Sequence, residues 1–375
     1  MLLTEDFNPM KVIIAGITDS GIYRARRSLI ELLISQGHSV VVIAPYTGVA
    51  EKLEALGAKY FDLKVDRHGL NPIKEFGVFR FFRSVLKKEK PNIVFTFTIK
   101  PNLYLGISCR MLNIPCVMNI TGLGEGLMHE GSTKHVLLKI YPIATKKASC
   151  IFFQNVFNRQ FFIDNKLANP KIFRLLPGSG VDVDNFMPME YPEENDGIRF
   201  LFVSRIVKDK GIDELITAIR EIKKKHNNVE FHFVGGCADE YKESLDKWKS
   251  EGLIVYHGRV APEEMKDYYK MTHCLIHPSY HEGMANVILE SAACGRPCMA
   301  SDINGCKEGI DDGKTGFVFK VKSSAAIVER IEAFLALSHD EKITMGLAGR
   351  RKMEREFDRT IVTNAYMDAF KEFAR

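Results

Sequence analysis

Short apolar runs alternate with segments of helical periodicity through the first half of the chain. Residues 11–15 are one such run, and in the segment that follows, Leu29, Leu32 and Leu33 share one helical face. Runs that are apolar at every position are typical of parallel strands, because those strands are buried on both faces of their sheet. We expect further strands at residues 39–44, 92–96, 116–119, 150–154 and 172–175. The pattern predicts a doubly wound α/β domain.

The same alternation restarts near residue 199. Before it, residues 177–188 are rich in glycine and proline, and residues 190–197 are polar without periodicity, which is typical of a linker. Further strands are expected at residues 199–204, 229–234, 253–257, 274–277, 297–300 and 316–319. We therefore predict a first domain at residues 1–186, a second at residues 187–357, and a C-terminal helix, residues 358–375, that packs back on the first.

The composition is that of a globular protein, with 46% hydrophobic and 26% charged residues. The sequence has no run of eighteen apolar residues and no charged-then-apolar leader pattern, so neither a membrane-spanning helix nor a secretory leader is expected. The eight cysteines lack the spacing of a disulfide framework or a zinc site. They are expected to be buried thiols of a cytoplasmic protein.

The net charge of +5 is unevenly distributed along the chain. Residues 1–186 hold 24 of the 52 Lys and Arg and 15 of the 47 Asp and Glu, a balance of +9. The remaining 28 basic and 32 acidic residues give residues 187–375 a balance of −4. A basic first domain indicates an anionic partner, such as a membrane surface, phosphate groups or nucleic acid.

Residues 71–88 predict a helix that is both aromatic and basic. Asn71 is expected to be its N-cap and Pro72 its first residue. Ile73 and Phe76 begin an apolar face, and lysines and arginines surround the remainder of the helix. Two interpretations stay open. The helix is a crossover packed on the sheet, or it also rests on an anionic bilayer surface.

Two glycine-bearing loops follow expected strands of the first half. The loop at residues 16–24 contains only Gly16 and Gly21, and Pro45 ends the next strand, which disfavours a nicotinamide dinucleotide site. Its backbone amides can still approach an anionic ligand at the helix start. Residues 120–126 include three glycines within five residues just after a strand, where ligands bind in parallel sheets.

In the second half, Arg205 and Lys210 flank a strand-to-helix loop beside Gly211. Two cations at a helix start suit a diphosphate, although each cation by itself is typical of a solvated surface. Asp182 and Asp184 resemble a D-x-D metal–nucleotide motif. Their position in a boundary turn without other carboxylates disfavours a metal site.

Glu282 and Glu290 are separated by seven residues near the start of an expected helix at residues 286–294. We expect Glu282 at the loop–helix junction, where the helix macrodipole favours a carboxylate. Glu290 would then lie about 80° around the helix and roughly 12 Å along it. Two acids so arranged suit the two ends of an elongated polar ligand, but by itself such a spacing more often marks solvated helix acids.

Several segments together carry a resemblance to a known family. They are residues 178–188, 204–211, 278–290, 293–297 and 304–308. Over nearly its whole length the chain resembles the GT-B glycosyltransferases, and within them the large retaining family 4 of bacterial polysaccharide and glycan transferases. Residues 98–102 and 119–124 further resemble the branch that extends saccharides on polyprenyl diphosphate. The implied fold class is α/β, with two doubly wound Rossmann-like domains facing across a cleft.

The resemblance implies a role for each matched residue. Arg205 and Lys210 would contact the donor diphosphate, Glu282 the hydroxyls of the donor sugar, and Glu290 the ribose. The first three would be the catalytic set. Backbone groups would contact the base at Gly258, Arg259 and Val260, and the phosphate and sugar at Gly283, Met284, Ala285 and Asn286. First-domain candidates are Gly16 and Gly21 for the donor, and Lys100, Asn119, Thr121, Gly122, Gly124 and Glu125 for the acceptor or donor sugar.

One departure from the family concerns the acceptor hydroxyl. Many relatives carry a histidine near the donor sugar in the first domain, whereas the matching strand here ends in Phe97 and Thr98. His129 is a candidate for the group that polarises the acceptor hydroxyl.

The resemblance implies retaining transfer of a sugar, an N-acetylhexosamine by the branch, from a UDP-sugar to a polyprenyl-diphosphate-linked saccharide. No metal or other cofactor is expected, since side-chain cations can neutralise the leaving diphosphate, and no nucleic acid partner is expected. The protein would be cytoplasmic, bound peripherally to the inner face of the cytoplasmic membrane. Three alternatives stay open: a transferase with a soluble acceptor, a GT-B nucleotide-sugar epimerase, and a UDP-sugar-binding module without turnover.

Overall fold

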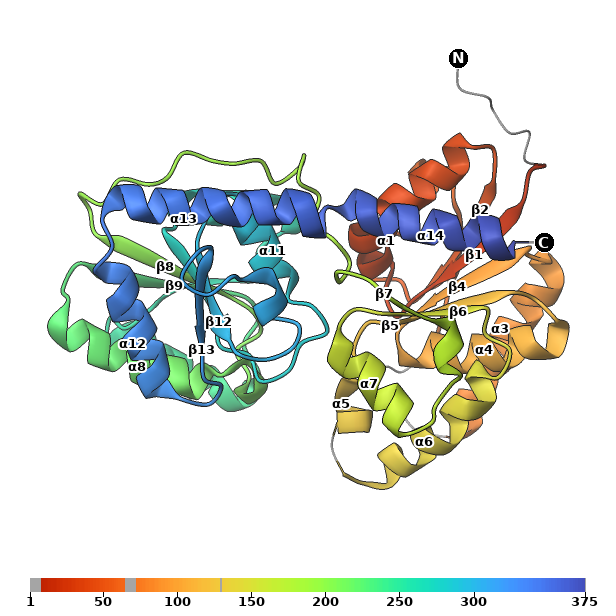
Figure 1. Cartoon of the computed structure of the whole chain (residues 1–375). Coiled ribbons are helices and arrows are strands. Elements are labelled where there is room, and N and C mark those ends of the chain that lie inside the picture. The colour runs from red at the N-terminus through yellow and green to blue at the C-terminus, as the bar shows by residue number, and fades with distance from the viewer. Residues whose placement is uncertain (1–7, 65–71, 129, 375) are drawn as a thin grey trace, which may run out of the picture. The chain divides into compact units, whose positions relative to one another are not determined.

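The computed structural model describes residues 8–64, 72–128 and 130–374. The chain divides into two compact units, Met1–Ser179 with Thr360–Arg375, and Gly180–Arg359 (Figure 1). The chain passes from one unit to the other after Ser179 and again after Arg359. The domain boundaries expected from the sequence, after residues 186 and 357, lie a few residues from these two positions. Each unit is an α/β domain built on one parallel sheet.

The described part of the first unit contains a seven-stranded sheet in the order β3-β2-β1-β4-β5-β6-β7. Every pair of neighbouring strands is parallel. The strands are β1 (Lys11–Ala15), β2 (Ser39–Ala44), β3 (Lys59–Asp62), β4 (Ile93–Phe97), β5 (Cys116–Ile120), β6 (Cys150–Phe153) and β7 (Phe173–Leu175). The chain runs outward from β1 to β3 and then returns to β4, so the order reverses between β1 and β4. The carboxyl ends of these two strands therefore flank the position where ligands bind in such sheets.

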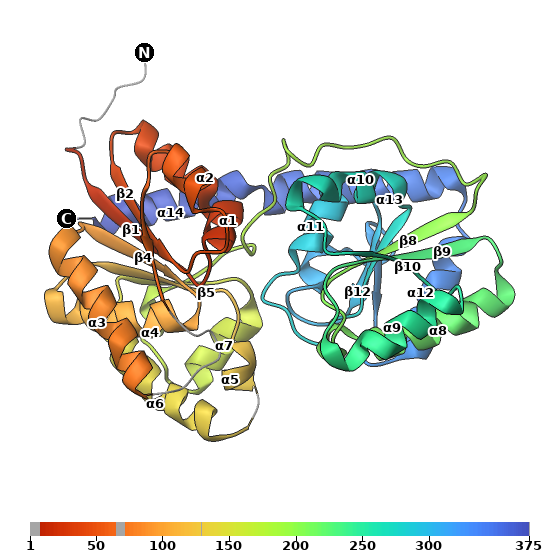
Figure 2. The ribbon, with the colours of Figure 1, turned by 180° about the vertical axis from the view of Figure 1, so that it is seen from behind.

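Helices cover both faces of this sheet (Figures 1 and 2). They are α1 (Asp19–Ser35), α2 (Ala50–Ala55), α3 (Pro72–Glu89), α4 (Ile99–Leu112), α5 (Gly124–Met128), α6 (Ser132–Thr145), α7 (Val156–Asp164), the 3₁₀ turn η1 (Pro170–Ile172) and α14 (Arg359–Phe373). Alternate strand residues enter different cores. Ile13 packs in one core with Phe82 of α3, and Val12 packs in the other with Leu29 of α1. This two-sided burial explains why inner strands such as β1 and β2 are apolar at consecutive positions.

The described part of the second unit contains a six-stranded parallel sheet in the order β10-β9-β8-β11-β12-β13. Its strands are β8 (Ile198–Val203), β9 (Val229–Val234), β10 (Val255–Gly258), β11 (Cys274–His277), β12 (Cys298–Ser301) and β13 (Gly316–Phe319). The order reverses between β8 and β11. The prediction of two doubly wound α/β domains is therefore confirmed, with most strand ends within one or two residues of their expected positions.

The helices of the second unit also lie on both faces (Figure 2). Helices α8, α9 and α12 pack in one core, and α10 and α11 pack in the other. The helices are α8 (Ile212–Lys225), α9 (Lys242–Ser250), α10 (Met265–Met271), α11 (Asn286–Ala293), α12 (Ser324–Leu335), α13 (His339–Lys352) and the π-helical turn η6 (Met353–Phe357). Short 3₁₀ turns are η2 (Lys208–Lys210), η3 (Asp239–Tyr241), η4 (Pro262–Glu264) and η5 (Lys307–Gly309).

The C-terminal helix α14 completes the first unit. Its Tyr366 is buried and packs edge-on against the rings of Phe95, Phe97 and Phe152. The Tyr366 hydroxyl donates to Oδ1 of Asn119 at 2.8 Å. The apolar face of α14 thus covers one side of the first sheet, although the second unit lies between them in the sequence.

The segment expected to be a linker is fixed to the second unit by two buried arginines. Arg296 is 1% exposed, and its guanidinium donates to the carbonyls of Met189 and Glu190 at 3.0 and 2.6 Å. Arg350 donates to the carbonyls of Val183 and Phe186 at 2.9 and 2.6 Å. A guanidinium offers five donors, so one side chain can satisfy several carbonyls of a segment without regular structure. The absence of periodicity therefore marks irregular backbone, not a free linker.

The segment after β5 differs from the expected glycine loop. Residues 120–126 are not one open loop, because α5 begins at Gly124 and Leu127 is buried in the core. Two of the three glycines are residues of this short helix, and Leu123 and Leu127 bury its start and end. Asn71 and His129 lie outside the described residues.

Helix α3 is a crossover helix with an exposed first turn. Phe82 and Leu86 are buried against the sheet, which confirms the packed interpretation of residues 71–88. Nearer its start, Ile73 is 84% exposed and Phe76 is 59% exposed. The contact with a bilayer stays a prediction.

Candidate functional site

Three loops meet at the carboxyl edge of the second sheet, next to the point where the strand order reverses. They follow β8, β11 and β12. The Tyr280 amide donates to the Asp209 carbonyl at 2.8 Å, and the Ala285 amide donates to the Gly305 carbonyl at 2.8 Å. These bonds join the loop after β11 to both of its neighbours.

Two glycines make this close approach possible. Gly211 has a φ of +69°, and a Cβ there would lie 2.1 Å from the Pro278 carbonyl oxygen. Gly305 has a φ of +89°, and a Cβ there would lie 2.6 Å from the Glu282 carbonyl oxygen. Both distances are far below van der Waals contact, so any larger residue would push the loops apart.

The Glu282 carboxylate lies at the centre of this cluster. Its Oε1 atom is 2.5 Å from Nζ of Lys210 and 2.9 Å from Nε2 of His277. Lys210 Nζ also lies 3.5 Å from the Ser279 hydroxyl. The side chains of Lys210 and Glu282 are 18% and 15% exposed, so the pair is only partly screened by solvent. The structure thus brings together two of the three residues expected to be catalytic.

The electrostatics of Glu282 follow from these contacts. Burial by itself would raise the pKa of the carboxyl, but the hydrogen bond and charge of His277 and then the charge of Lys210 outweigh it. The net result is a pKa of about 2, well below the ordinary value of 4.5. Glu282 is therefore a carboxylate at neutral pH and can accept hydrogen bonds from hydroxyl groups.

The reason given above for the position of Glu282 is wrong. Helix α11 begins at Asn286 and has no acidic residue in its first turn. Glu282 therefore lies in the loop, and Lys210 and His277 stabilise its charge in place of the helix macrodipole. The expected angle of about 80° between the two acids does not apply either, because only Glu290 is helical.

Glu290 lies in α11 and is fixed by a different partner. The buried Tyr269 hydroxyl donates to its Oε2 at 2.9 Å. Burial and then the nearby Glu290 charge raise the pKa of Tyr269 well above its ordinary value, so the hydroxyl stays a donor. Glu290 is partly exposed. The two acids are thus held independently, each by a side chain from another element.

Arg205 and the loop after β10 lie on the β9 side of the same edge. Arg205 is exposed, and no hydrogen bond or ion pair of the described residues restrains it. A Cβ on Gly236 would lie 2.5 Å from Nε of Arg259, so that side chain crosses the backbone of the loop after β9. The Gly235 amide donates to the Gly258 carbonyl at 2.7 Å. Arg205 and residues 258–260 therefore lie in loops on either side of the loop after β9.

The expected amide donors of residues 283–286 are partly used inside the protein. The Ala285 amide is bonded to Gly305. Gly283, Met284 and Asn286 are partly exposed on the same loop. Their contact with a ligand stays a prediction.

In the first unit, the loop at Gly16 and Gly21 forms the start of α1. The Gly21 amide donates to the Thr18 hydroxyl at 2.9 Å, and the Ser20 amide donates to Oδ1 of Asp19 at 2.6 Å. Asp19 is fully buried and also accepts from the Thr47 and Val49 amides. Burial by itself would raise the pKa of Asp19, but these donors lower it overall. Two of the amides expected to approach an anion therefore already have acceptors within the protein.

The acceptor-side candidates differ in how accessible they are. Lys100 forms an ion pair with Glu75 of α3 at 2.6 Å. Asn119 is 1% exposed and holds Tyr366 and the Thr96 carbonyl, so its contacts are structural. Thr121 and Gly122 are partly exposed after β5. Gly124 opens α5, of which Glu125 is the next residue, and packs against Ile99 at the start of α4.

Thr98 is the most strained residue of this region. It follows β4 at the reversal point and has a φ of +75°, which is rare for a β-branched residue. Its hydroxyl is buried and has no hydrogen-bond partner among the described residues. Strain of this kind concentrates at functional sites. The sequence indicated only that a threonine replaces the histidine of many relatives.

Two further residues of the site were missed by sequence reasoning. His277 and Tyr269 hold Glu282 and Glu290, yet nothing in the sequence marks them out from other residues of a buried strand and an amphipathic helix. The signal that identifies them is tertiary, since each donates to one of the two acids.

The D-x-D sequence lies outside this cluster. Asp182 Oδ1 accepts from the Asn185 amide at 2.9 Å and so caps a turn. Among the described residues, no group of three His, Cys, Asp or Glu side chains could hold a metal ion.

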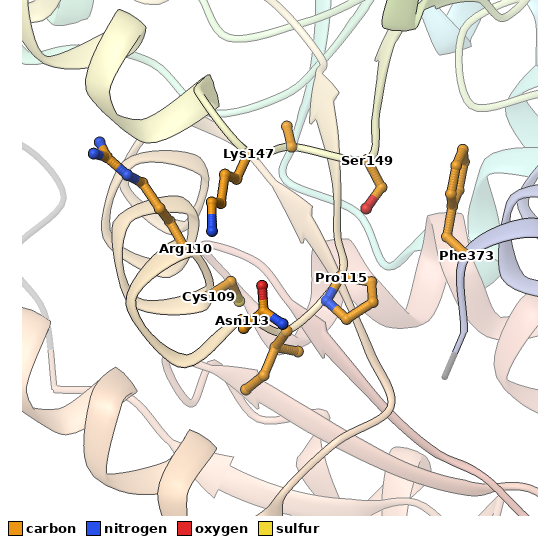
Figure 3. A pocket seen from close by; sticks show the side chains of 9 residues that line it. Cys109, Arg110, Asn113, Pro115, Lys147, Ser149 and Phe373 are labelled. Carbon is orange, nitrogen blue, oxygen red and sulfur yellow. The ribbon is translucent and has the colours of Figure 1, made fainter.

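A cavity of about 330 Å³ opens in the first unit, at the amino ends of the strands of its sheet (Figure 3). It is lined by Pro115 and Ser149, which precede β5 and β6, and by Arg110, Lys147 and Phe373. It therefore lies at the amino ends of the strands and contains none of the expected site residues.

Two family models match the chain. Residues 16–155 match the model described as glycosyl transferase 4-like, and residues 185–351 match glycosyl transferases group 1. Among curated proteins, an N,N'-diacetylbacillosaminyl-diphospho-undecaprenol alpha-1,3-N-acetylgalactosaminyltransferase of Campylobacter jejuni is 25% identical, covering 94% of this chain and 96% of that protein. The capsular polysaccharide biosynthesis glycosyltransferase CapM of Staphylococcus aureus is 26% identical over 69% of this chain and 63% of its own length.

Solved structures share the fold. A glycosyltransferase from Rickettsia africae has a TM-score of 0.79 at 18% identity, covering 98% of this chain and 99% of that chain. Anabaena Alr3699/HepE in complex with UDP-glucose has a TM-score of 0.79 at 15% identity, covering 97% of this chain and 100% of that chain. At these identities the likeness concerns the fold alone.

The depressed pKa of Glu282 predicts a pH-dependent contribution to stability. A lowered folded-state pKa stabilises the protein above the unfolded-state value near 4.5, and this stabilisation is lost as the pH falls through about 2. We expect Glu282→Gln to lower the unfolding free energy by roughly 3 kcal/mol near pH 7. The difference in unfolding free energy between Glu282→Gln and wild type should become smaller only below about pH 4.5. Urea denaturation from pH 7 to pH 4 measures it.

The control for this experiment is Glu243→Gln, at an exposed position of α9. It should change stability little at any pH. A Glu282→Gln deficit that stays constant down to pH 4, or no deficit at all, would contradict the assigned interaction.

Proposed function

The chain belongs to the family 4 glycosyltransferases of the GT-B fold, with a 4-like first domain and a group 1 second domain, and on that basis we propose a specific reaction. The enzyme moves a sugar from a UDP-sugar to a polyprenyl-diphosphate-linked saccharide with retention of configuration. The observation that carries this proposal is the contact between Lys210 and Glu282 at the carboxyl edge of the second sheet. This contact brings a cation that can bind a diphosphate next to a carboxylate that can accept hydrogen bonds from sugar hydroxyls. One nucleotide-sugar molecule can therefore reach both groups.

The proposed donor site uses the three loops and α11. Lys210 and Arg205 bind the diphosphate, Glu282 binds hydroxyls of the sugar, and Glu290 binds the two ribose hydroxyls. The base lies against the backbone of residues 258–260, and the amides of residues 283–286 approach the phosphate and sugar. In the first domain, the family resemblance keeps residues 16–21 as candidates for the donor, and Lys100 and residues 121–125 as candidates for the acceptor or donor sugar.

The chemistry we propose needs no protein nucleophile. As the glycosidic bond breaks, negative charge gathers on the leaving diphosphate, and Lys210 and Arg205 stabilise it electrostatically. The acceptor attacks from the face that the diphosphate leaves, and a diphosphate oxygen takes the acceptor proton. Because two side-chain cations act on the leaving group, the proposed reaction uses no metal.

The proposed acceptor and sugar rest on the relatives. The Campylobacter jejuni protein, which matches this chain along nearly its whole length, is named as an N-acetylgalactosaminyltransferase acting on an undecaprenol-diphosphate saccharide. This name supports a lipid-linked acceptor and an N-acetylhexosamine donor for this chain. The UDP-sugar is the donor that the family resemblance implies.

A lipid-linked acceptor requires contact with a membrane surface. Residues 1–186 carry the balance of +9 described above, and the first turns of α3 expose Ile73 and Phe76 beside Lys74 and Arg80. Exposed apolar side chains flanked by cations suit an anionic bilayer interface. None of the helices in the described part of the chain has the length and apolar character needed to cross a bilayer. We therefore propose peripheral binding to the inner face of the cytoplasmic membrane through α3.

Removal of the donor cations should slow turnover strongly. We expect Lys210→Ala and Arg205→Ala each to lower kcat by about 100-fold or more, because each removes charge stabilisation of the leaving diphosphate. UDP release from UDP-N-acetylhexosamines, with and without a polyprenyl-diphosphate saccharide, measures the effect. Lys208→Ala, an exposed lysine of the same turn, is the matched control and should keep wild-type turnover.

The same assay separates the alternatives. Wild-type kinetics in Lys210→Ala would refute the donor site. Conversion of one UDP-sugar into another without any acceptor would favour a nucleotide-sugar epimerase. UDP release with a water-soluble acceptor would favour a soluble-acceptor transferase, and UDP binding without turnover would favour a binding module.

Chelation should leave the reaction unchanged. Because the cations are side chains, activity in excess EDTA is expected to equal activity with added Mg²⁺ or Mn²⁺. Loss of activity in EDTA that either ion restores would show that the enzyme requires a metal.

Membrane binding should depend on the exposed residues of α3. We expect the double variant Ile73→Ser, Phe76→Ser to bind anionic liposomes at low salt about tenfold more weakly than wild type. Leu347→Ser is the matched control, since Leu347 is 42% exposed on α13 of the second unit. Equal sedimentation of all three proteins with the vesicles, or no binding by wild type, would refute this contact.

A further inference from the structure

His277 lies in the donor site but has no role in the reaction as proposed so far. It is the last residue of β11, pairs in register with Ala300 of β12, and is 3% exposed. Its Nε2 atom is 2.9 Å from Glu282 Oε1. Its Nδ1 atom is buried without a hydrogen-bond partner among the described residues. Nε2 carries a hydrogen, because that nitrogen faces a carboxylate oxygen, which can only accept.

Lys210 donates to the same oxygen of Glu282, at 2.5 Å. The two donors differ in how firmly they are held. Lys210 extends from a 3₁₀ turn on a flexible side chain, whereas the His277 ring is enclosed at the end of a central strand. An ammonium on four methylenes can turn toward a new anion, and a buried ring on a strand cannot.

Donor binding would make the two anions compete for Lys210. A diphosphate carries more negative charge than one carboxylate and is the ligand assigned to Lys210 in the proposed function. As the diphosphate enters, Lys210 turns partly or wholly toward it. The contact between Lys210 and Glu282 then weakens at the moment when Glu282 has to meet the sugar.

We propose that His277 is the positioning residue that keeps Glu282 in place during this exchange. Its Nε2–H continues to donate to Oε1 while Lys210 moves to the diphosphate, so the carboxylate remains directed at the donor-sugar hydroxyls. The loop gives further support, because Gly305 and Asp209 hold the backbone on either side of Glu282. This inference rests on the proposed function and assigns to it one more residue, which acts through Glu282.

The experiment compares two amide replacements of His277. The amide of His277→Gln can occupy the position of Nε2, whereas the shorter His277→Asn can reach only the position of Nδ1. We expect His277→Asn to raise the KM for the UDP-sugar and lower kcat/KM by about tenfold to a hundredfold, the usual effect of losing a hydrogen bond to a charged group. His277→Gln should recover most of that loss. Calorimetric binding of UDP, which lacks the transferred sugar, should be the same in wild type and both variants.

The outcomes separate this inference from the function on which it rests. Wild-type donor kinetics in His277→Asn would overturn the inference while the transferase assignment stands. If both variants lost UDP binding as well as sugar transfer, His277 would support the fold of the whole site. That result would also overturn the inference. If wild-type protein released no UDP from any UDP-sugar, the proposed function would fail first, and the inference would fall with it.

Discussion

The Glu282 carboxylate is held where three loops converge, by one donor from the loop after β8 and one from the end of β11. Lys210 and His277 share one of its oxygens, and Gly211 and Gly305 let the backbones come close enough for these contacts. The arrangement depends on the parallel sheet beneath it, because only parallel strands bring successive loops to the same edge. A partly buried carboxylate needs such donors, since burial by itself would favour its neutral form.

Buried cations also fix irregular backbone elsewhere in the second unit. Arg296 and Arg350 satisfy carbonyls of the segment between the two domains, which lacks the ladder bonds of a helix or strand. The cost of burying a guanidinium is offset only when its donors are satisfied, and here the carbonyls supply the acceptors. The same principle operates at Glu282 and at these arginines: a charged group is buried where several partners converge on it.

The first unit distributes its polar groups differently. Several of its expected site residues serve the fold, as Asn119 does by holding Tyr366 of α14, and the amides at the start of α1 are bonded to Thr18 and Asp19. Thr98 is the exception, with a strained backbone and a buried hydroxyl that lacks a partner among the described residues. The second unit thus holds a preformed cluster of charged side chains, and the first holds a strained threonine at the reversal point of its sheet.

The sequence by itself determined the architecture. Parallel strands are buried on both faces, so they appear in the sequence as apolar runs such as residues 11–15. It also indicated the cations Arg205 and Lys210 and the two acids, since glycines and charges at strand ends are local features. It could not determine that Glu282 lies before its helix, that His277 and Tyr269 hold the acids, or that Asn119 is structural. Those facts depend on which loops and rings meet in space, and a residue in a buried strand carries no local mark of the partner it will contact from another element.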